Sequence, residues 1–399
     1  MHLCPSTKIL FIEACNFVNA PQGGQLTAAR MLMKAFGEQI ALCGWTDDPK
    51  VSLGVWQKRR IDGVEFDFFA TAFVSSNQPK CPFLPARLTA WWQFKRYARA
   101  ILSSGIRIVL TREPVVMMAL PFRSEHRVFF WFPGIEPALS VSRYAWAKRF
   151  SSLFDHHLNR KLRKHAFVLL AAADAEAIIS LKRRANGMLD GFDIRTFPTR
   201  VDTSVFHPCD EACERGAKKK MLDIPVATEL LIVTSGRLHR VKGWSLLLDA
   251  FEEFRKWHPT AHLVFVGDGS DRKALEQAVH DKKITHAVSL VGFQSQEKLA
   301  VYLQAADLFV MGSEKEGWCT SLVEALACGL PIVTTRFSGA DTLVHDGVNG
   351  FVVSRDPMEF AGAMERALHL SHVHEYSREA IPSYALCNLR HDVTSLLGV

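Results

Sequence analysis

The chain has 399 residues, a formal net charge of +7, 48% hydrophobic residues and 22% charged residues. This composition is ordinary for a globular protein, and the length predicts two domains. The nine scattered cysteines complete no zinc-site spacing and predict reduced thiols in a cytoplasmic protein. The N-terminal residues lack the layout of a signal peptide, and no apolar run reaches the roughly 18 to 20 residues that span a bilayer.

Positive charge is concentrated in the first half of the sequence. Residues 1–205 hold 28 Lys and Arg against 16 Asp and Glu, a balance of +12, whereas residues 206–399 hold 20 against 25, a balance of −5. This asymmetry predicts that the first half meets an anionic partner or surface. The sequence contains no nucleic-acid recognition motif, so a nucleic acid is not the predicted partner.

Short apolar runs alternate with helical patterns along both halves of the chain. The runs are nearly continuous in Val, Ile, Leu and Phe, which indicates strands buried on both faces of a parallel sheet. The predicted fold class is α/β, with two Rossmann-like domains that each contain a parallel sheet. The predicted strands are 8–13, 64–70, 106–110, 127–132 and 167–172 in the first half, then 229–235, 262–267, 288–291, 307–311 and 331–335 in the second.

The segment 197–225 marks the predicted domain boundary, because it holds three prolines and a Lys-Lys-Lys run and shows no sustained period. We therefore place the N-terminal domain at 1–205 and the C-terminal domain at 206–375. Two such domains would leave a cleft between the carboxyl ends of their strands, where ligands of open α/β sheets bind.

Two strand ends in the second half carry residues that suit a nucleotide diphosphate. After strand 229–235, Gly236 allows close backbone approach, and Arg237 and Lys242 are cations that suit phosphate; a solvated turn with two surface charges is the alternative. After strand 307–311, Glu316 precedes a helix predicted to begin near residue 320 or 321. The free N–H groups and positive end of that helix favour an anion.

Glu324 lies in the first turn of that predicted helix and has two interpretations. Ser321 and Glu324 have the spacing of a capping box, in which Glu324 accepts a hydrogen bond from the Ser321 N–H. Glu316 could equally be one more solvated loop charge. The second interpretation is that both carboxylates accept hydrogen bonds from hydroxyl groups of a nucleotide sugar. The basic pair and the helix start in the same domain favour this second interpretation.

The second half resembles retaining glycosyltransferases of family 4, which have the two-Rossmann-domain GT-B architecture. The resemblance covers roughly residues 195–370 and rests on an ordered set of segments, each of which is weak alone. The segments are VDTSVFHP (201–208), SGRL-x3-KG (235–243), VGDGSDRKALE (266–276), GF (292–293), EGW-x6-EALACGLPIV (316–333), which is similar to the E-x7-E motif, and SGADTLVHDGVNGFVV (338–353).

The resemblance implies a role for each matching residue. Arg237 and Lys242 would neutralise the donor diphosphate, Glu324 would accept hydrogen bonds from the ribose, and Glu316 would contact the transferred sugar. The implied catalytic set is Glu316, Arg237 and Lys242, with no metal ion and no cofactor. The other implied donor-binding positions are Gly236 and Gly267, and Gly292 and Phe293 in the turn near the base. The backbone of Gly317, Trp318, Cys319 and Thr320 is also implied to face the donor.

The first half resembles the family less closely. Its glycine-rich turn, with Gly23 and Gly24, would bring backbone close to donor or acceptor, and a plain strand-to-helix turn is the alternative. Phe132 and Pro133 stand where many relatives carry a histidine. Residues 376–399 are long enough for the last helix that relatives send back across to the first domain.

Two segments of the basic half, 86–102 and 143–165, combine aromatic residues with cations. Segment 143–165 holds seven Lys and Arg and one acidic residue. This composition suits an anionic membrane surface or a phosphorylated lipid-linked acceptor, and an ordinary solvated helix is the alternative. The sequence therefore predicts a cytoplasmic protein, with peripheral association at the inner face of the membrane left open.

The function that the sequence predicts is a metal-independent, retaining sugar transfer. The donor would be a UDP- or GDP-sugar, and the acceptor a glycan or a lipid-linked glycan in cell-surface polysaccharide biosynthesis, such as lipopolysaccharide, O-antigen or capsule. Two alternatives stay open. One is another GT-B enzyme, such as a nucleotide-sugar epimerase or a glucan synthase, and the other is a non-catalytic protein that binds nucleotide sugars.

Overall fold

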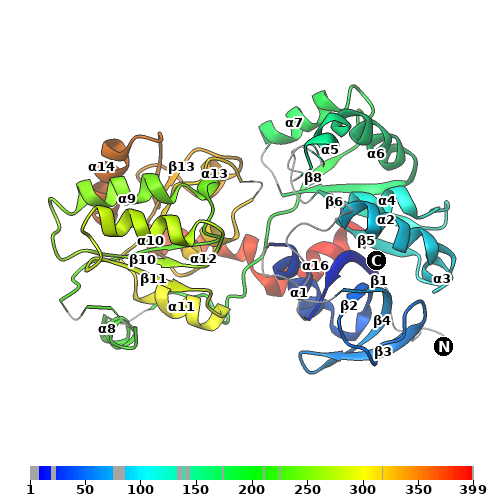
Figure 1. Cartoon of the computed structure of the whole chain (residues 1–399), viewed down its shortest axis with the longest axis horizontal. Coiled ribbons are helices and arrows are strands. Elements are labelled where there is room, and N and C mark those ends of the chain that lie inside the picture. The colour runs from blue at the N-terminus through cyan, green and yellow to red at the C-terminus, as the bar shows by residue number, and fades with distance from the viewer. Residues whose placement is uncertain are drawn as a thin grey trace. The chain divides into compact units, whose positions relative to one another are not determined.

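The computed structural model describes residues 9–18, 24–74, 86–132, 137, 139, 144–172, 175–209, 212–222, 224–225, 227–316 and 318–397. The chain divides into two compact units, drawn in Figure 1. Unit 1 consists of Met1–Pro198 and Leu389–Val399, and unit 2 consists of Thr199–Asn388. Each unit is described by itself.

Unit 1 contains an eight-stranded sheet with the order β3-β4-β2-β1-β5-β6-β7-β8. Neighbouring strands are parallel, except that β3 pairs antiparallel with β4 at one edge. The strands are β1 (Ile9–Asn16), β2 (Ile40–Thr46), β3 (Trp56–Ile61), β4 (Val64–Phe73), β5 (Ile108–Thr111), β6 (Arg127–Phe132), β7 (Ala166–Ala171) and β8 (Ile194–Thr196).

Helices connect these strands and cover the sheet of unit 1. The core that they form includes Leu10 and Ile12 of the central strand β1, both fully buried. The helices are α1 (Gly24–Phe36), α2 (Ala86–Arg96), α3 (Ala98–Leu102), α4 (Pro114–Ala119), α5 (Ala145–Arg149), α6 (Ser151–His165) and α7 (Ala175–Arg184). The last helix, α16 (Leu386–Leu397), begins in unit 2 and contributes most of its residues to unit 1.

Unit 2 contains a six-stranded sheet with the order β11-β10-β9-β12-β13-β14, in which all neighbours are parallel. The strands are β9 (Leu231–Ser235), β10 (His262–Val266), β11 (Val288–Gly292), β12 (Leu308–Met311), β13 (Ile332–Thr335) and β14 (Gly350–Val353). The helices are α8 (Ala212–Lys220), α9 (Trp244–Phe254), α10 (Arg272–Asp281), α11 (Gln296–Ala305), α12 (Thr320–Ala327), α13 (Ala340–Leu343), α14 (Pro357–Leu368) and α15 (Val373–Ala380).

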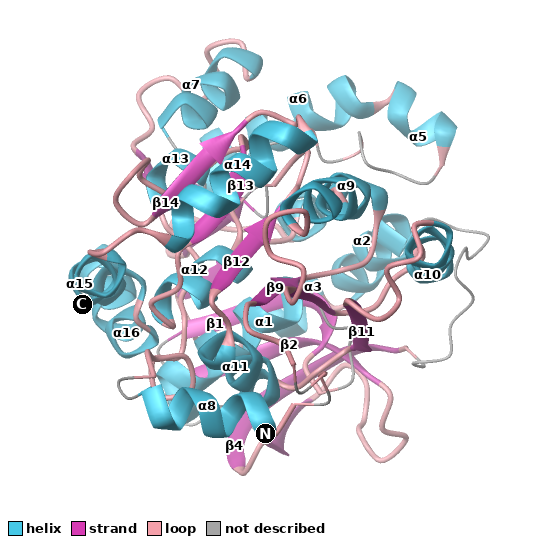
Figure 2. Cartoon of the chain, turned by 90° about the vertical axis from the view of Figure 1, so that its left-hand side faces the viewer, coloured by secondary structure: helices cyan, strands magenta, loops and turns pink. Residues whose placement is uncertain are grey.

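The sheet of unit 2 is buried on both faces, as its nearly continuous apolar strands predict. Successive residues of a strand point to opposite faces. Ile232 of β9 accordingly packs in the core formed with α9, α10 and α14, whereas its neighbours Leu231 and Val233 pack in the core formed with α11 and α12. Figure 2 shows these strands between the two helical layers.

Each of the ten predicted strand segments overlaps a strand, and segment 127–132 coincides with β6. Strands β2, β3, β8 and β14 were not predicted. β3 reads Trp-Gln-Lys-Arg-Arg-Ile and is a partly exposed edge strand, so it carries little of the apolar signal. β8 and β14 have three and four residues, which is too short for a periodic pattern. Gly44 and Trp45 interrupt the aliphatic run of β2.

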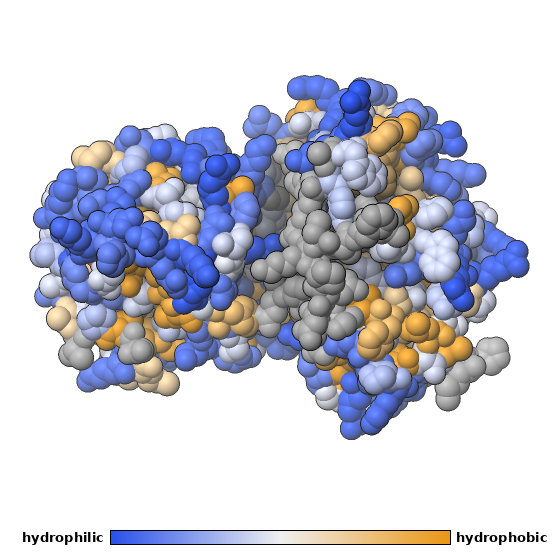
Figure 3. All heavy atoms as spheres, in the orientation of Figure 1, coloured by the Kyte–Doolittle hydropathy of each residue, from blue (hydrophilic) through white to orange (hydrophobic). Residues whose placement is uncertain are grey.

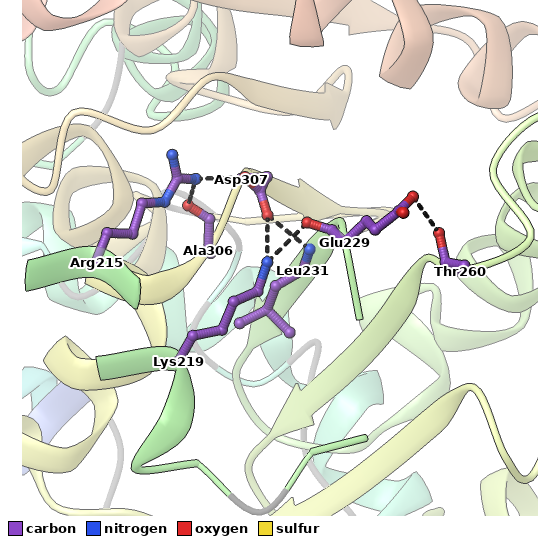
Figure 4. Close-up of polar contacts among 7 residues, drawn as sticks. All are labelled: Arg215, Lys219, Glu229, Leu231, Thr260, Ala306 and Asp307. Carbon is purple, nitrogen blue, oxygen red and sulfur yellow. Dashed lines mark hydrogen bonds and ion pairs between the residues drawn. The ribbon is translucent and has the colours of Figure 1, made fainter. Parts of the chain in front are cut away.

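Helix α8 is attached to the amino edge of the unit 2 sheet through one carboxylate (Figure 4). Asp307 Oδ1 accepts a hydrogen bond from Arg215 Nη2 (2.7 Å), and its Oδ2 accepts from the Leu231 N–H (2.7 Å) and from Lys219 Nζ (3.3 Å). Lys219 also donates to the Glu229 carbonyl (2.7 Å). Asp307 precedes β12 and Leu231 begins β9, so this carboxylate links two neighbouring central strands to α8.

Asp307→Ala is expected to lower the free energy of unfolding by about 2 kcal/mol, because it leaves two cations and a strand N–H without their shared acceptor. Urea unfolding measures this loss. Asp307→Asn keeps an acceptor oxygen and should lose less. Asp341→Ala is the matched control, since the Asp341–Arg336 pair is largely exposed and should contribute under about 0.5 kcal/mol. Equal losses in the Asp341 and Asp307 alanine variants would contradict the attachment role.

Candidate functional site

The carboxyl ends of three neighbouring strands of unit 2 surround a pocket. β10, β9 and β12 are adjacent in the sheet, and ligands of open parallel sheets bind outside such strand ends. The pocket is lined by apolar residues, two cations and three residues with hydroxyl groups. The lining residues are Thr234, Ser235, Gly236, Arg237, Leu238, Lys242, Trp244, Leu247, Phe265, Val266, Met311 and Ser313.

The loops around the pocket pack backbone against backbone, which requires glycine. A Cβ added to Gly267 would lie 1.9 Å from the Gly236 carbonyl oxygen, and one added to Gly243 would lie 1.7 Å from the Gly312 carbonyl oxygen. Gly267 and Gly243 also have φ values of 147° and 71°, which side-chain-bearing residues rarely adopt. The loops after β9, β10 and β12 are therefore held in close contact at the site.

Lys242 and Glu316 form an ion pair at this edge of the sheet. Their side chains are 33% and 13% exposed, so the pair is partly shielded from water. Ser313 Oγ donates a second hydrogen bond to Glu316 Oε1 (2.7 Å), and the Ser313 carbonyl accepts one from Thr335 Oγ1 (2.6 Å). The Glu316 carboxylate is thus fixed by contacts that reach from the β9 loop to β13.

Arg237 and Ser235 are two further polar residues that line the pocket. Arg237 is exposed and lines the pocket. Ser235 is 8% exposed, and its hydroxyl has no hydrogen-bond partner among the residues that the structure describes. Buried hydroxyl groups are normally paired, so this one is available to a ligand or a bound water.

Helix α12 begins next to the ion pair. Cys319 is its N-cap residue, with no side-chain capping bond, and Thr320 is the first helical residue. Ser321 therefore lies inside the helix, and the capping-box interpretation of Glu324 is wrong. Burial and the nearby Glu316 raise the pKa of the Cys319 thiol to about 12, so this group stays protonated near neutral pH.

Glu324 lies one turn into α12 rather than in its first turn. The residue is 6% exposed, and burial raises the pKa of its carboxyl group to about 8. No side-chain hydrogen bond to Glu324 is found within the described part of the chain. A buried carboxyl group with a strongly raised pKa is a common mark of a functional site, and Glu324 is not among the residues that line the pocket.

The other positions named from the sequence are dispersed around this edge. Trp318 is half-buried and packs against Gly339, and its ring centroid lies 6.3 Å from that of Tyr384. The Gly292 carbonyl accepts a hydrogen bond from the Gly267 N–H (2.9 Å), and Phe293, 57% exposed, follows β11. In unit 1, Gly24 begins α1. Gly23 and Gly317 lie outside the described residues.

Unit 1 holds a row of candidate side chains that was not predicted. Ile12 of β1 pairs with Thr111 of β5, which pairs with Phe130 of β6, so the next residues, Glu13, Arg112 and Trp131, are neighbours at the carboxyl edge. The Arg112 guanidinium lies 4.5 Å over the Trp131 ring, and Glu13 is 1% exposed. The sequence signal that could have indicated this row was a charged residue within an apolar strand, as at Glu13, or directly after one, as at Arg112.

The described residues contain no group of three or more His, Cys, Asp and Glu side chains placed to hold a metal ion. Their helices are also all too short or too polar to pass through a bilayer.

Curated glycosyltransferases are similar to part of this chain. A D-inositol 3-phosphate glycosyltransferase of Acidothermus cellulolyticus is 30% identical over 216 residues, 52% of this chain and 47% of that protein. A lipopolysaccharide core biosynthesis glycosyltransferase of Rhizobium meliloti is 31% identical over 174 residues, 40% of this chain and 49% of that protein. The chain spans about half the length of the curated relatives it matches.

A solved structure shares the fold over both units. The crystal structure of Anabaena HepE in complex with UDP and glucose matches 98% of this chain and 99% of that one, with a TM-score of 0.68 and 17% identity. At this identity the likeness establishes the fold alone, which is the two-domain α/β fold of GT-B glycosyltransferases. Residues 219–384, which include Lys242, Glu316 and α12, match the family model of group 1 glycosyl transferases.

Proposed function

We propose that the protein transfers a sugar from a nucleotide diphosphate sugar to a glycan or lipid-linked acceptor. One observation carries this proposal: the Lys242–Glu316 ion pair lies beside Arg237 and the start of α12, at the edge of a parallel sheet. Two cations and a helix start suit a diphosphate, and a fixed carboxylate beside them suits sugar hydroxyl groups. The match of residues 219–384 to group 1 glycosyl transferases supports the same function.

The proposed chemistry is departure of the nucleoside diphosphate with retention of configuration. Arg237, Lys242 and the N–H groups at the start of α12 would stabilise the negative charge that develops on the leaving diphosphate, without a metal ion. The leaving diphosphate oxygen would take the proton of the attacking acceptor hydroxyl, so no protein group is assigned as general base. The sugar–phosphate bond breaks as the new glycosidic bond forms on the same face.

The remaining residues would orient the donor. Glu316 would hold the transferred sugar, and Glu324, eight positions later, would accept hydrogen bonds from the ribose. The backbone of residues 317–320 would face the sugar and the phosphates. Gly236 and Gly267 would let backbone approach the diphosphate, and Gly292 and Phe293 would border the base.

We propose that unit 2 binds the donor and that unit 1 is the acceptor side. The row of Glu13, Arg112 and Trp131 lies at the carboxyl edge of the unit 1 sheet, and Gly24 begins α1, the helix that follows β1 in the chain. Gly23 is proposed for the same side from its place in the sequence. Mixed carboxylate and guanidinium groups beside an aromatic ring suit a polyhydroxylated acceptor. Similarity to a lipopolysaccharide core enzyme supports a cell-surface polysaccharide as its destination, with the protein cytoplasmic and peripheral at a membrane.

Screening UDP- and GDP-sugars tests this function. One donor at 100 times its dissociation constant is expected to stabilise the protein by about 2.7 kcal/mol, detected as a higher melting temperature. With a glycan acceptor, that donor should yield a glycoside of retained configuration, in the presence of EDTA as in its absence. Isomerised sugar from donor alone would indicate an epimerase, chain extension of glucan a glucan synthase, and binding without hydrolysis or transfer a non-catalytic protein.

A further inference from the structure

Helices α5 and α6 of unit 1 expose three large apolar side chains on one side. Trp146 of α5, Phe150 between the two helices and Leu153 of α6 are 56%, 53% and 55% exposed, and their spacing of four and three residues is that of a helical stripe, interrupted where the helix breaks at Phe150. Phe150 joins the two helices, since its N–H bonds to the Ala147 carbonyl and its carbonyl accepts from the Phe154 N–H. Single exposed apolar residues are common, but three in register are not.

The fold does not use this stripe, because a different side of the same helices packs in the core. Ala147, Leu158 and Leu162 are buried, and Phe154 packs against the core cluster of unit 1. An amphipathic surface helix normally turns its apolar side inward and its polar side outward. Here large apolar residues appear on both sides, so the outer three serve something other than the core.

Cationic residues continue the same stripe. After Leu153 the sequence spacing leads to His157, Arg160 and Lys164, all exposed. Exposed cations also flank the apolar residues at Lys148 and Arg149. Trp and Phe beside Lys and Arg are the composition of protein surfaces that lie in the interface of a bilayer with anionic lipids.

Two other apolar surfaces of unit 1 fit a membrane less well. Figure 3 shows hydrophobic atoms gathered over β2–β4, but there the exposed Val64 lies between the exposed acids Asp62 and Glu65. On α2, Leu88 and Trp92 are exposed, and the Arg96 guanidinium lies 5.4 Å from the Trp92 ring centroid. The stripe of α5 and α6 has three large exposed apolar side chains beside its cations, one more than α2.

We propose that the stripe formed by Trp146, Phe150, Leu153, His157, Arg160 and Lys164 docks unit 1 on an anionic lipid bilayer. The three apolar side chains enter the interfacial region, and Arg160 and Lys164 contact lipid phosphates. This names the surface for the peripheral association given under the proposed function. The docking does not depend on sugar transfer, so the two ideas fail separately.

Vesicle co-sedimentation tests the proposal on the full chain without nucleotide sugar. The wild type should bind vesicles of phosphatidylglycerol and phosphatidylcholine, bind pure phosphatidylcholine weakly, and release from the anionic vesicles as salt rises. The variant Trp146→Ser/Phe150→Ser/Leu153→Ser should lower the partition coefficient roughly tenfold or more, and Arg160→Gln/Lys164→Gln should lower it on anionic vesicles only. All changed side chains are exposed, and circular dichroism verifies folding.

The matched control is Leu88→Ser/Trp92→Ser, which removes exposed apolar residues from α2 and should leave vesicle binding unchanged. Greater loss in this control than in the α5–α6 variant would overturn the assignment, as would absence of wild-type binding to anionic vesicles. Transfer to a water-soluble acceptor should be equal in wild type and the α5–α6 variants, which separates loss of docking from loss of the proposed activity.

Discussion

Lys242→Ala is expected to weaken the binding of free UDP or GDP by roughly 10- to 100-fold, the effect of losing one charge-assisted hydrogen bond. The variant removes a cation from the pocket, and it also leaves Glu316 without the counter-charge that it has in the ligand-free molecule. An uncompensated carboxylate near the phosphates would repel them further. Isothermal titration calorimetry with the nucleoside diphosphate alone measures the loss, and Arg237→Ala should show a loss of the same sign.

Glu316→Ala should behave in the opposite way towards the free diphosphate. Removing the carboxylate releases Lys242 from its ion pair, so affinity for UDP or GDP should be unchanged or higher. Sugar transfer should nevertheless fall by roughly 100- to 1000-fold, because the group that holds the transferred sugar is lost. This separation of binding from transfer follows from the ion pair and would not arise if Glu316 were an ordinary solvated loop charge.

Arg240→Ala is the matched control for Lys242→Ala. Arg240 is an exposed cation in the same 3-10 turn, Arg240–Lys242, but it does not line the pocket. Its removal changes the net charge equally and should have little effect on diphosphate affinity. Equal affinities in the Arg237, Lys242 and Arg240 variants would contradict the assignment of the two pocket cations.

The parts of the fold that could be predicted are the strands whose own sequence is a continuous apolar run. β9 reads Leu-Ile-Val-Thr-Ser and is buried along its length, so its sequence alone indicates a central parallel strand. Because ligands of parallel sheets bind at the carboxyl edge, the residues after β9 and β12 were predictable as site candidates. The edge strand β3 has no apolar run, and the local signal for it was the two-residue turn Asp62-Gly63, both at positive φ, which joins it to β4.

The contacts within the site depend on residues far apart in the chain. Lys242 and Glu316 are 74 residues apart, and only the order β9–β12 in the sheet brings their loops together. The row of Glu13, Arg112 and Trp131 likewise depends on the order β1-β5-β6. For Glu324, the local spacing favoured a capping box, whereas the helix begins earlier and buries the carboxyl group. The spacing of Ser321 and Glu324 left two interpretations of Glu324 open, and the burial of its carboxyl group in the folded chain argues against the capping box.

Glu324→Gln is expected to remove a pH dependence of stability that the wild type has. The pKa of the Glu324 carboxyl group is about 8 in the folded chain, against an ordinary value of 4.5 for an unperturbed glutamate. Between these values the folded chain holds a proton that the unfolded chain has lost, so the free energy of unfolding falls as pH rises. The fall is at most about 1.4 kcal/mol per pH unit and stops above the folded pKa.

Urea unfolding at pH 5 and pH 8 measures this effect as a difference between the two proteins, in which the other titrating groups cancel. Gln is a neutral isostere of the protonated carboxyl group, so the variant should match the wild type near pH 5. By pH 8 it should be the more stable protein by on the order of 3 kcal/mol. A stability difference that is the same at both pH values would show that Glu324 is ionised in the folded chain throughout.

Binding of a nucleoside diphosphate should then release a proton from Glu324 near pH 7. In the proposed site the ribose hydroxyl groups donate to this carboxylate, which favours its ionised form and lowers its pKa. Calorimetry of UDP or GDP binding in two buffers of different ionisation enthalpy counts the protons released, and Glu324→Gln corrects for protons exchanged by the diphosphate itself. The wild type should release up to one proton more than the variant, and a 2′,3′-dideoxy nucleotide should remove that excess. An equal count for both proteins with the ribonucleotide would exclude contact between an ionised Glu324 and the ribose.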